Sequence, residues 1–132
     1  MKRLLRYMVV VAFAFAFIPF HAIATVAEAQ ASIESILFAR GVESKEPVGV
    51  AKEFDASVVQ VFCWTKLSSK APPTAVKHVW YKAGQKVLEV PLTINYSSGR
   101  YWSVKNVSIG DWTVEVVGAN GEVIGAASFK VK

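Results

Sequence analysis

The chain has 132 residues, of which 53% are apolar and 19% are charged. This length allows one domain and excludes a multidomain enzyme or a repeat array. The net charge is +5, but residues 30–132 contain twelve cations and nine anions, a balance of +3. Such a mild excess argues against a dedicated nucleic-acid-binding protein.

The first 29 residues have the three-part pattern of a secretory signal peptide. A positively charged start precedes the apolar stretch Tyr7–Phe20, and small residues follow it. Cleavage is expected after Ala29, with Ala24 and Ala31 as alternative sites. The sequence therefore predicts an exported protein, periplasmic or extracellular, made of one domain over residues 30–132.

An uncleaved membrane anchor is the alternative to a signal peptide. Continuing the apolar stretch to Ala27 gives a span barely as long as the ~20 residues that a membrane helix needs. Pro19 and His21 lie inside that span and disfavour it. No cysteine lies near the cleavage site, so a bacterial lipoprotein anchor is not indicated. We expect no membrane span after processing.

Cys63 is the only cysteine of the chain. Export leads to an oxidising compartment, yet a single cysteine can form no internal disulfide. Stability must come from packing, and a mature chain of about 100 residues is enough for one hydrophobic core. Cys63 lies within Val58–Thr65, where a small apolar residue suits the core, so a buried inert thiol is expected. A reactive or intermolecular cysteine is the alternative.

Apolar residues in the exported part recur at every second position. Trp112, Val114 and Val116 alternate with polar residues, which is typical of a half-buried strand. Leu88–Ile94 alternates in the same way, and its Pro91 cannot donate to a ladder, which places this strand at a sheet edge. Five further strands are predicted at Ser35–Arg40, Ala56–Lys66, Val76–Lys82, Arg100–Val107 and Val123–Val131.

Turn residues separate these strands and indicate the fold class. Ala83–Gly84, Ser97–Gly99 and Asn120–Gly121 fall between consecutive strands, and an Asn-Gly pair tolerates positive φ at both positions of a hairpin turn. Seven short strands with regular turns predict an all-β, antiparallel, immunoglobulin-like sandwich. The segment Gly41–Phe54 shows no clear period and is predicted to cross between the sheets.

The largest side chains predicted to face the core are Trp80 and Trp112. Each buried indole N–H then needs a hydrogen-bond acceptor. Phe129 gives the last strand an inner face, and the small residues Gly125 and Ala127 are expected to leave room for the tryptophans.

Several blocks of this sequence together resemble one bacterial family. The blocks are Phe38–Val48, Val76–Trp80, Arg100–Lys105 and Gly110–Val116, closed by Gly121 and Phe129. They resemble a family of exported or membrane-attached proteins known only as a domain of unknown function, number twenty-nine fourteen. The resemblance extends over about Ile36–Val131. It implies one compact exported β-domain, and it transfers no catalytic residue because the family has no assigned activity.

The residue types leave little room for catalysis. His78 is the only histidine outside the leader, and one histidine with Cys63 cannot supply the three or four protein ligands of a zinc site. A Cys63/His78 nucleophile pair is conceivable, but His78 shares the parity of Trp80 and is expected to be a hydrogen-bonded core residue. Serine elbows, phosphate loops and calcium loops are absent from the sequence. We expect no enzyme, no cofactor and no metal.

Aromatic and basic residues gather around the turn Ser97–Gly99. An exposed aromatic ring beside a guanidinium can stack a sugar or bind an acidic polymer. The alternative is that Trp102 belongs to the core and the tyrosines cover an edge. Whether Trp64 is buried or exposed is also open, because it and Cys63 must point to opposite faces of one strand. The candidate binding residues are Tyr96, Arg100, Tyr101, Trp102, Lys105 and Trp64.

Three classes of function stay open. The first is a non-catalytic binding or accessory module of the bacterial cell envelope, with a glycan or a partner protein as ligand. The second is a structural subunit that assembles through open edge strands. An enzyme is the third. Arg100, Lys105, Lys77, Lys82 and Lys86 would form a basic stripe if their strands were neighbours, and a solvated basic face is the alternative.

Overall fold

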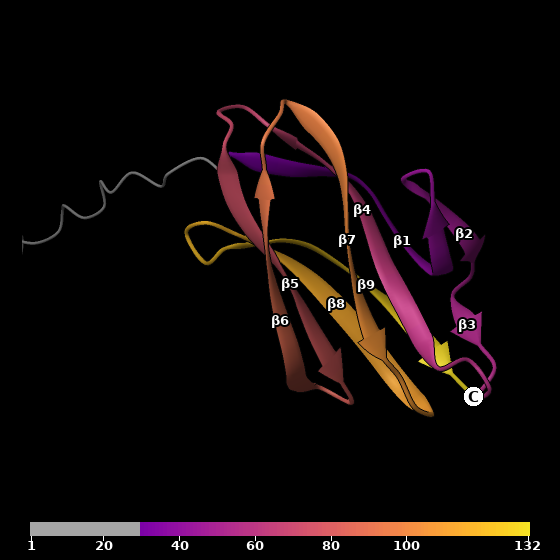
Figure 1. Cartoon of the computed structure of the whole chain (residues 1–132). Coiled ribbons are helices and arrows are strands. Elements are labelled where there is room, and N and C mark those ends of the chain that lie inside the picture. Colours follow the sequence, from indigo (N-terminus) through magenta and orange to yellow (C-terminus); the bar gives the residue numbers. More distant parts are fainter. Residues whose placement is uncertain (1–29) are drawn as a thin grey trace, which may run out of the picture.

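The computed structural model describes residues 30–132 (Figure 1). This part of the chain is all-β, with nine strands and no helix. Accordingly, a search of residues 30–132 finds no helix able to cross a membrane. The predicted signal peptide, residues 1–29, lies outside the described residues.

The strands form two sheets packed as layers (Figure 1). Their bounds are β1 (Ala31–Glu43), β2 (Glu46–Val50), β3 (Glu53–Phe54), β4 (Gln60–Ser69), β5 (Thr74–Lys82), β6 (Gln85–Ile94), β7 (Ser98–Asn106), β8 (Gly110–Gly118) and β9 (Val123–Val131). One sheet has the order β2-β1-β4-β7 and the other has the order β3-β9-β8-β5-β6. The predicted β-sandwich is confirmed, with nine strands in place of seven.

The strand order is that of an immunoglobulin-like sandwich. Strands β1, β4 and β7 take the places of A, B and E in one layer, and β5, β8 and β9 take those of C, F and G in the other. The prediction of wholly antiparallel sheets is wrong at one pair, because β3 runs parallel to β9. All other strand pairs are antiparallel.

The segment Gly41–Phe54 crosses between the sheets as predicted, but it also forms a hairpin that the sequence did not indicate. β1 continues to Glu43 and pairs with β2 across a two-residue turn. Ser44 and Lys45 occupy this turn with φ of 51° and 68°. The turn lacks the Gly and Asn residues that signal such geometry, which is why periodicity and turn chemistry missed it.

The predicted edge position of the Pro91 strand is confirmed. β6 is the outer strand of the five-stranded sheet. It is joined to β5 by a two-residue turn in which Ala83 and Gly84 have φ of 50° and 82°. The Asn120–Gly121 turn differs from the expectation, because only Gly121 has a positive φ, 87°.

Phe129 is the centre of the larger core cluster. Its ring stacks on Trp112 at a centroid distance of 5.9 Å, lies 4.5 Å from Phe38 and meets Trp80 edge-on at 6.2 Å. Both tryptophans are buried, as predicted. The space at Gly125 serves another purpose than expected, because an added Cβ would clash with Ile33 of the opposite sheet rather than with an indole.

Candidate functional site

Cys63 and His78 are both buried in the core, as the interpretation without catalysis expected. Neither Cys63 nor His78 has any exposed surface, and the ring nitrogens of His78 bond to Thr65 and Ser103 instead of the thiol. Burial raises the pKa of the Cys63 thiol, which keeps it protonated and a poor nucleophile. Across residues 30–132, no three His, Cys, Asp or Glu side chains lie close enough together to hold a metal ion.

A continuous hydrogen-bond chain accounts for the polar side chains of the core. The indole of Trp80 donates to Ser103 Oγ at 3.0 Å, and Thr65 Oγ1 donates to the carbonyl oxygen of Tyr101 at 2.8 Å. Thr65 Oγ1 therefore accepts from Nε2–H of His78 at 3.1 Å, and Ser103 Oγ donates to Nδ1 at 2.7 Å. This pattern assigns the neutral Nε2–H tautomer. Burial lowers the pKa of His78 to about 4. The hydrogen bonds of His78 to Thr65 and Ser103 join the two sheets, because His78 lies on β5 and its two partners lie on β4 and β7.

The outer faces of the two sheets differ in chemistry. On the five-stranded sheet Glu89 pairs with Lys77 and Lys86, and Tyr81 donates a hydrogen bond to Glu115. The outward side chains of the four-stranded sheet include an apolar group: Leu37, Ala39, Val48, Val50, Phe62, Trp64, Trp102 and Val104. Three of these valines are about 40–50% exposed. Charged residues lie on the same face, where Lys66 pairs with Arg100 in the β4–β7 register and Glu46 forms an ion pair with Arg100. An exposed group of apolar side chains marks an interaction site more often than a fully charged surface does.

Trp64 lies on this outer face, yet it is only 5% exposed. Its indole N–H donates to the carbonyl oxygen of Lys45 at 2.9 Å, so the tip of the β1–β2 hairpin folds over the ring. Cys63 points to the opposite face and is buried too. Neither side chain is exposed, because the hairpin supplies a cover for Trp64 that strand alternation alone cannot show.

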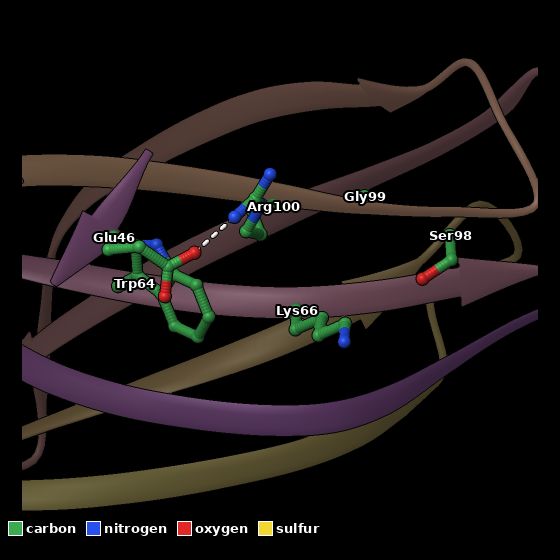
Figure 2. Close-up of a pocket in the computed structure, with 6 residues that line it drawn as sticks. All are labelled: Glu46, Trp64, Lys66, Ser98, Gly99 and Arg100. Atoms are coloured by element: carbon green, nitrogen blue, oxygen red, sulfur yellow. Dashed lines mark hydrogen bonds and ion pairs between the residues drawn. The ribbon is translucent and has the colours of Figure 1, made fainter. Parts of the chain in front are cut away.

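A hollow of about 440 Å³ lies beside Trp64 (Figure 2). Its lining residues are Glu46, Trp64, Lys66, Ser98, Gly99 and Arg100. Figure 2 shows the Glu46 carboxylate in front of the indole, paired with the guanidinium of Arg100. Both charged groups remain substantially exposed, which makes this ion pair weak and open to replacement by a ligand.

Trp102 is a partly exposed aromatic ring of the outer face, as is Phe62. Trp102 sits opposite Trp64 in the β4–β7 register, and it is partly exposed rather than part of the core. Its neighbours along the same face of β7 are Arg100 and Val104, and Val104 is 39% exposed. Trp102 and Arg100 therefore share one face, as the binding hypothesis requires.

The two tyrosines lie at the end of this surface. Tyr96 is 72% exposed in the β6–β7 turn. Tyr101 points inward, packs against the smaller core cluster and accepts a hydrogen bond from the Asn95 amide at 3.2 Å. Both tyrosines line a second hollow of about 260 Å³ together with Lys45 and Arg100.

Lys105 lies apart from the other candidates. Its Nζ is 5.9 Å from the centroid of the Trp112 ring, where Lys82 also lies at 5.7 Å. The hypothetical basic stripe does not form, because Lys77 and Lys86 pair with Glu89 on the other sheet. The structure thus gathers Trp64, Arg100 and Trp102, with Tyr96 and Tyr101 at one end, and separates Lys105.

The chain was compared with known protein families. The model of the family described as Protein of unknown function (DUF2914) matches residues 73–131. This is the family that the sequence blocks indicate. Its description assigns no activity, and no curated protein matches the chain.

The match to the DUF2914 model covers β5 to β9. It includes Arg100 and Trp102, and it stops short of Trp64 and Glu46 on the preceding strands. The block Phe38–Val48, which carried part of the predicted resemblance, lies outside the matched segment.

Two residues of the site were missed by sequence reasoning. Lys66 has the same parity as Trp64 on β4, so the outward alternation of that strand could have found it. Glu46 gave no such signal, because its contact with Arg100 joins β2 to β7, which are not neighbours in the sheet.

Proposed function

We propose that the protein is a non-catalytic binding or accessory module, exported to the bacterial cell envelope, and that its ligand is a glycan or a partner protein. The binding surface is the part of the outer face formed by Trp102, Arg100 and the hollow beside Trp64. The leader at residues 1–29 supports export, and the family match brings no activity that would favour catalysis.

One observation carries this proposal: the partly exposed indole of Trp102 lies between the cationic side chain of Arg100 and the apolar side chain of Val104 on the outer face of the four-stranded sheet. An aromatic ring of this kind supplies contact area, and the adjacent guanidinium supplies directional hydrogen bonds. The opposite sheet offers no equivalent, because its outward charges pair with one another. This asymmetry favours the four-stranded sheet as the binding layer.

The test compares the wild-type protein with a Trp102→Ala variant. Removing the ring is expected to weaken capture by isolated peptidoglycan, by arrayed envelope glycans or by a co-purifying protein at least ~10-fold, the effect of an interface anchor residue. Circular dichroism and the melting temperature should stay close to wild type, because the ring is outside both core clusters.

Tyr81→Ala is the matched control, because Tyr81 is an aromatic residue on the outer face of the other sheet. It should leave capture unchanged. Equal capture by the wild-type and Trp102→Ala proteins, or no capture of any envelope component, would contradict the proposed surface.

A structural subunit is the second candidate, and the long open edge of β7 favours it. β7 has nine residues and no strand beyond it within residues 30–132. The protein assembles with itself if a second copy supplies the strand added at this edge, and with another protein if a partner supplies it.

A further inference from the structure

We propose that a partner protein donates an extended segment to the free edge of β7 and so adds a fifth strand to the four-stranded sheet. The segment is apolar at alternate positions and carries acidic rather than basic residues between them. This inference rests on the proposed function and names the partner of the same sheet.

The four sheet edges are protected to different degrees. β3 has only two residues, and β6 contains Pro91, which cannot donate to an added strand. β2 has five residues and contains Pro47. β7 is nine residues long, lacks proline, and pairs with β4 without a register shift. It is therefore the edge best suited to accept a strand.

The backbone groups that face the open side of β7 follow from two hydrogen bonds. Ser69 N donates to Ser97 O, and Val107 N donates to Val59 O, both at 2.9 Å. Antiparallel pairing alternates, so the odd-numbered residues of β7 bond to β4 and the even-numbered ones point away. The N–H and C=O groups of Arg100, Trp102 and Val104 thus face the open side, in a row along the edge.

An apolar row lies beneath the position of the added strand. Ser103 of β7 bonds to His78 and Trp80, so β5 faces β7 across the core. β6 is the next strand of that sheet and extends past the β7 edge (Figure 1). Its inward residues Leu88, Val90 and Leu92 remain partly exposed. Alternate apolar side chains of an added strand would cover this row.

The position next to β7 is a regular one in this architecture. In a constant-type immunoglobulin sandwich, strand D pairs at the outer edge of strand E. In residues 30–132 the remaining strand of the four-stranded sheet, β2, instead pairs with β1 at the opposite edge of that sheet. The layer is therefore built to extend at β7 without any change in the strands already present.

The overhang of β6 argues against a second copy of this chain as the occupant. A two-fold β7–β7 pairing keeps both five-stranded sheets on the same side of the joined layer. β6 of one copy and β5 of the other would then occupy the same space. A lone extended segment avoids this clash, because it brings no second layer with it.

The charge of the open side selects an acidic segment. β7 carries Arg100 and Lys105 and no carboxylate. Arg100 already pairs with Glu46 of β2, so Lys105 is the cation of β7 that an acidic residue of the added strand would meet. On β6 the single cation, Lys86, is matched by Glu89. Opposite charges across neighbouring strands are favourable and like charges are not. An acidic residue in the added strand would complement β7.

The first experiment selects random peptides as long as β7, nine residues, on the immobilised processed protein. The selected peptides are expected to be apolar at every second position and to hold more Asp and Glu than Lys and Arg. No enrichment, enrichment without alternation, or enrichment of basic peptides would overturn the inference.

The second experiment blocks the backbone pairing on each side. Val104→Pro removes an N–H that faces the open side, and it should weaken binding of the selected peptide about tenfold. Thr93→Pro is the matched control, because Pro91 pairs with Lys77 without an N–H, so the odd-numbered amides of β6, Thr93 included, face away from β5 at the edge of the other sheet. It should leave binding unchanged. Equal binding by the Val104→Pro and wild-type proteins would overturn the inference.

Peptide N-methylation makes the test independent of any folding defect in Val104→Pro. Methyl groups on one alternate set of amides should abolish binding, and methyl groups on the other set should not. Equal effects of both sets would exclude strand addition. A dimer in sedimentation that Val104→Pro dissociates would overturn the choice of partner.

The two proposals fail in different ways. Trp102→Ala keeps its amide, so loss of envelope-ligand capture in this variant, with full capture by Val104→Pro, supports the outer-face function and overturns strand addition. Loss of peptide binding in Val104→Pro, with envelope-ligand capture unaffected by Trp102→Ala, supports strand addition and overturns the outer-face function.

Discussion

Phe129 organises the larger core cluster through its contacts with four aromatic rings, those of Phe38, Phe54, Trp80 and Trp112. Trp112 is the ring that stacks on it, with an interplanar angle of 9°. The indole N–H of Trp112 is also satisfied, because it donates to the carbonyl oxygen of Ser108 at 2.9 Å. The side chain combines a large buried surface with a satisfied polar group, which is what makes a tryptophan stabilising in a core.

Trp112→Ala should be among the most destabilising single substitutions. The variant loses the stacked contact and leaves a cavity, which costs about 3–5 kcal/mol of unfolding free energy. Denaturant titration of both proteins measures the difference. Tyr96→Ala, at a 72% exposed position, is the control and should stay within about 0.5 kcal/mol of wild type. An unchanged midpoint for Trp112→Ala would contradict the position of this ring.

His78 makes the stability depend on pH. Its pKa is lowered from 6.5 to about 4 by burial, so the unfolded chain binds a proton that the folded protein excludes. The stability is complete above pH 6.5 and decreases as the pH falls toward 4. The loss at pH 4 is about 3 kcal/mol, at ~1.4 kcal/mol for each pKa unit.

The measurement compares unfolding free energies at pH 7 and pH 4 for the wild-type protein and for His78→Gln, which does not titrate. Glu53, Asp55 and Glu89 have lowered pKa values because of their hydrogen bonds, and they also lose stabilisation in acid. Their loss is common to both proteins and cancels in the comparison. The gap between the proteins should shrink toward pH 4, and a gap independent of pH would contradict a neutral His78.

Among the elements, the two short hairpins store backbone strain at residues with side chains. Ala83 in the β5–β6 turn and Ser44 and Lys45 in the β1–β2 turn all have positive φ. A side chain at such a position costs free energy, and asparagine tolerates it best after glycine. The β1–β2 turn keeps its shape because the Lys45 carbonyl is held by Trp64.

Ala83→Asn should therefore stabilise the protein. It creates an Asn-Gly pair in a turn whose two central residues already have positive φ, and the gain should be on the order of 0.5 kcal/mol. Thermal unfolding measures it. Ala119→Asn is the control, because Ala119 is equally exposed in the β8–β9 turn and has no positive φ. A gain at Ala119 equal to that at Ala83 would show that the turn conformation is not the cause.

At the scale of the whole molecule, the sandwich presents one face whose outward charges pair with one another and a second face that combines an apolar group with the Arg100–Glu46 ion pair. The start of β1 bears on how the exported form is produced. The Gln30 carbonyl accepts a hydrogen bond from Lys70 N at 2.9 Å, and Ala31 pairs with Ser69. Cleavage after Ala29 would keep both interactions, and cleavage after Ala31 would remove them.

Mass spectrometry of the protein recovered from an exporting bacterium should give a chain that begins at Gln30. A chain that begins at Thr25 would still contain the complete sandwich and would indicate the Ala24 site. A chain that begins at Ser32 should be less stable, because it lacks the first residues of the β1–β4 ladder. A chain that still begins at Met1 would contradict the signal peptide.

The sequence by itself determined the two-layer β architecture, the edge position of β6 and the burial of Trp80 and Trp112. Alternation and proline are local properties, so each strand reveals which of its faces is buried and whether its ladder can continue. The resemblance to the DUF2914 family was also readable from short blocks of residues, most of which lie in the matched segment.

Only the tertiary structure decided which candidate binding residues meet. Trp64 is covered by a hairpin without a turn signature, Arg100 pairs with Glu46 of a strand that is not its neighbour, and Lys105 lies by Trp112 instead of Trp102. These contacts depend on strand order and on the curl of β1 and β2 over the sheet. Alternation says which way a side chain points, but it holds no information about the distant segment that will lie there.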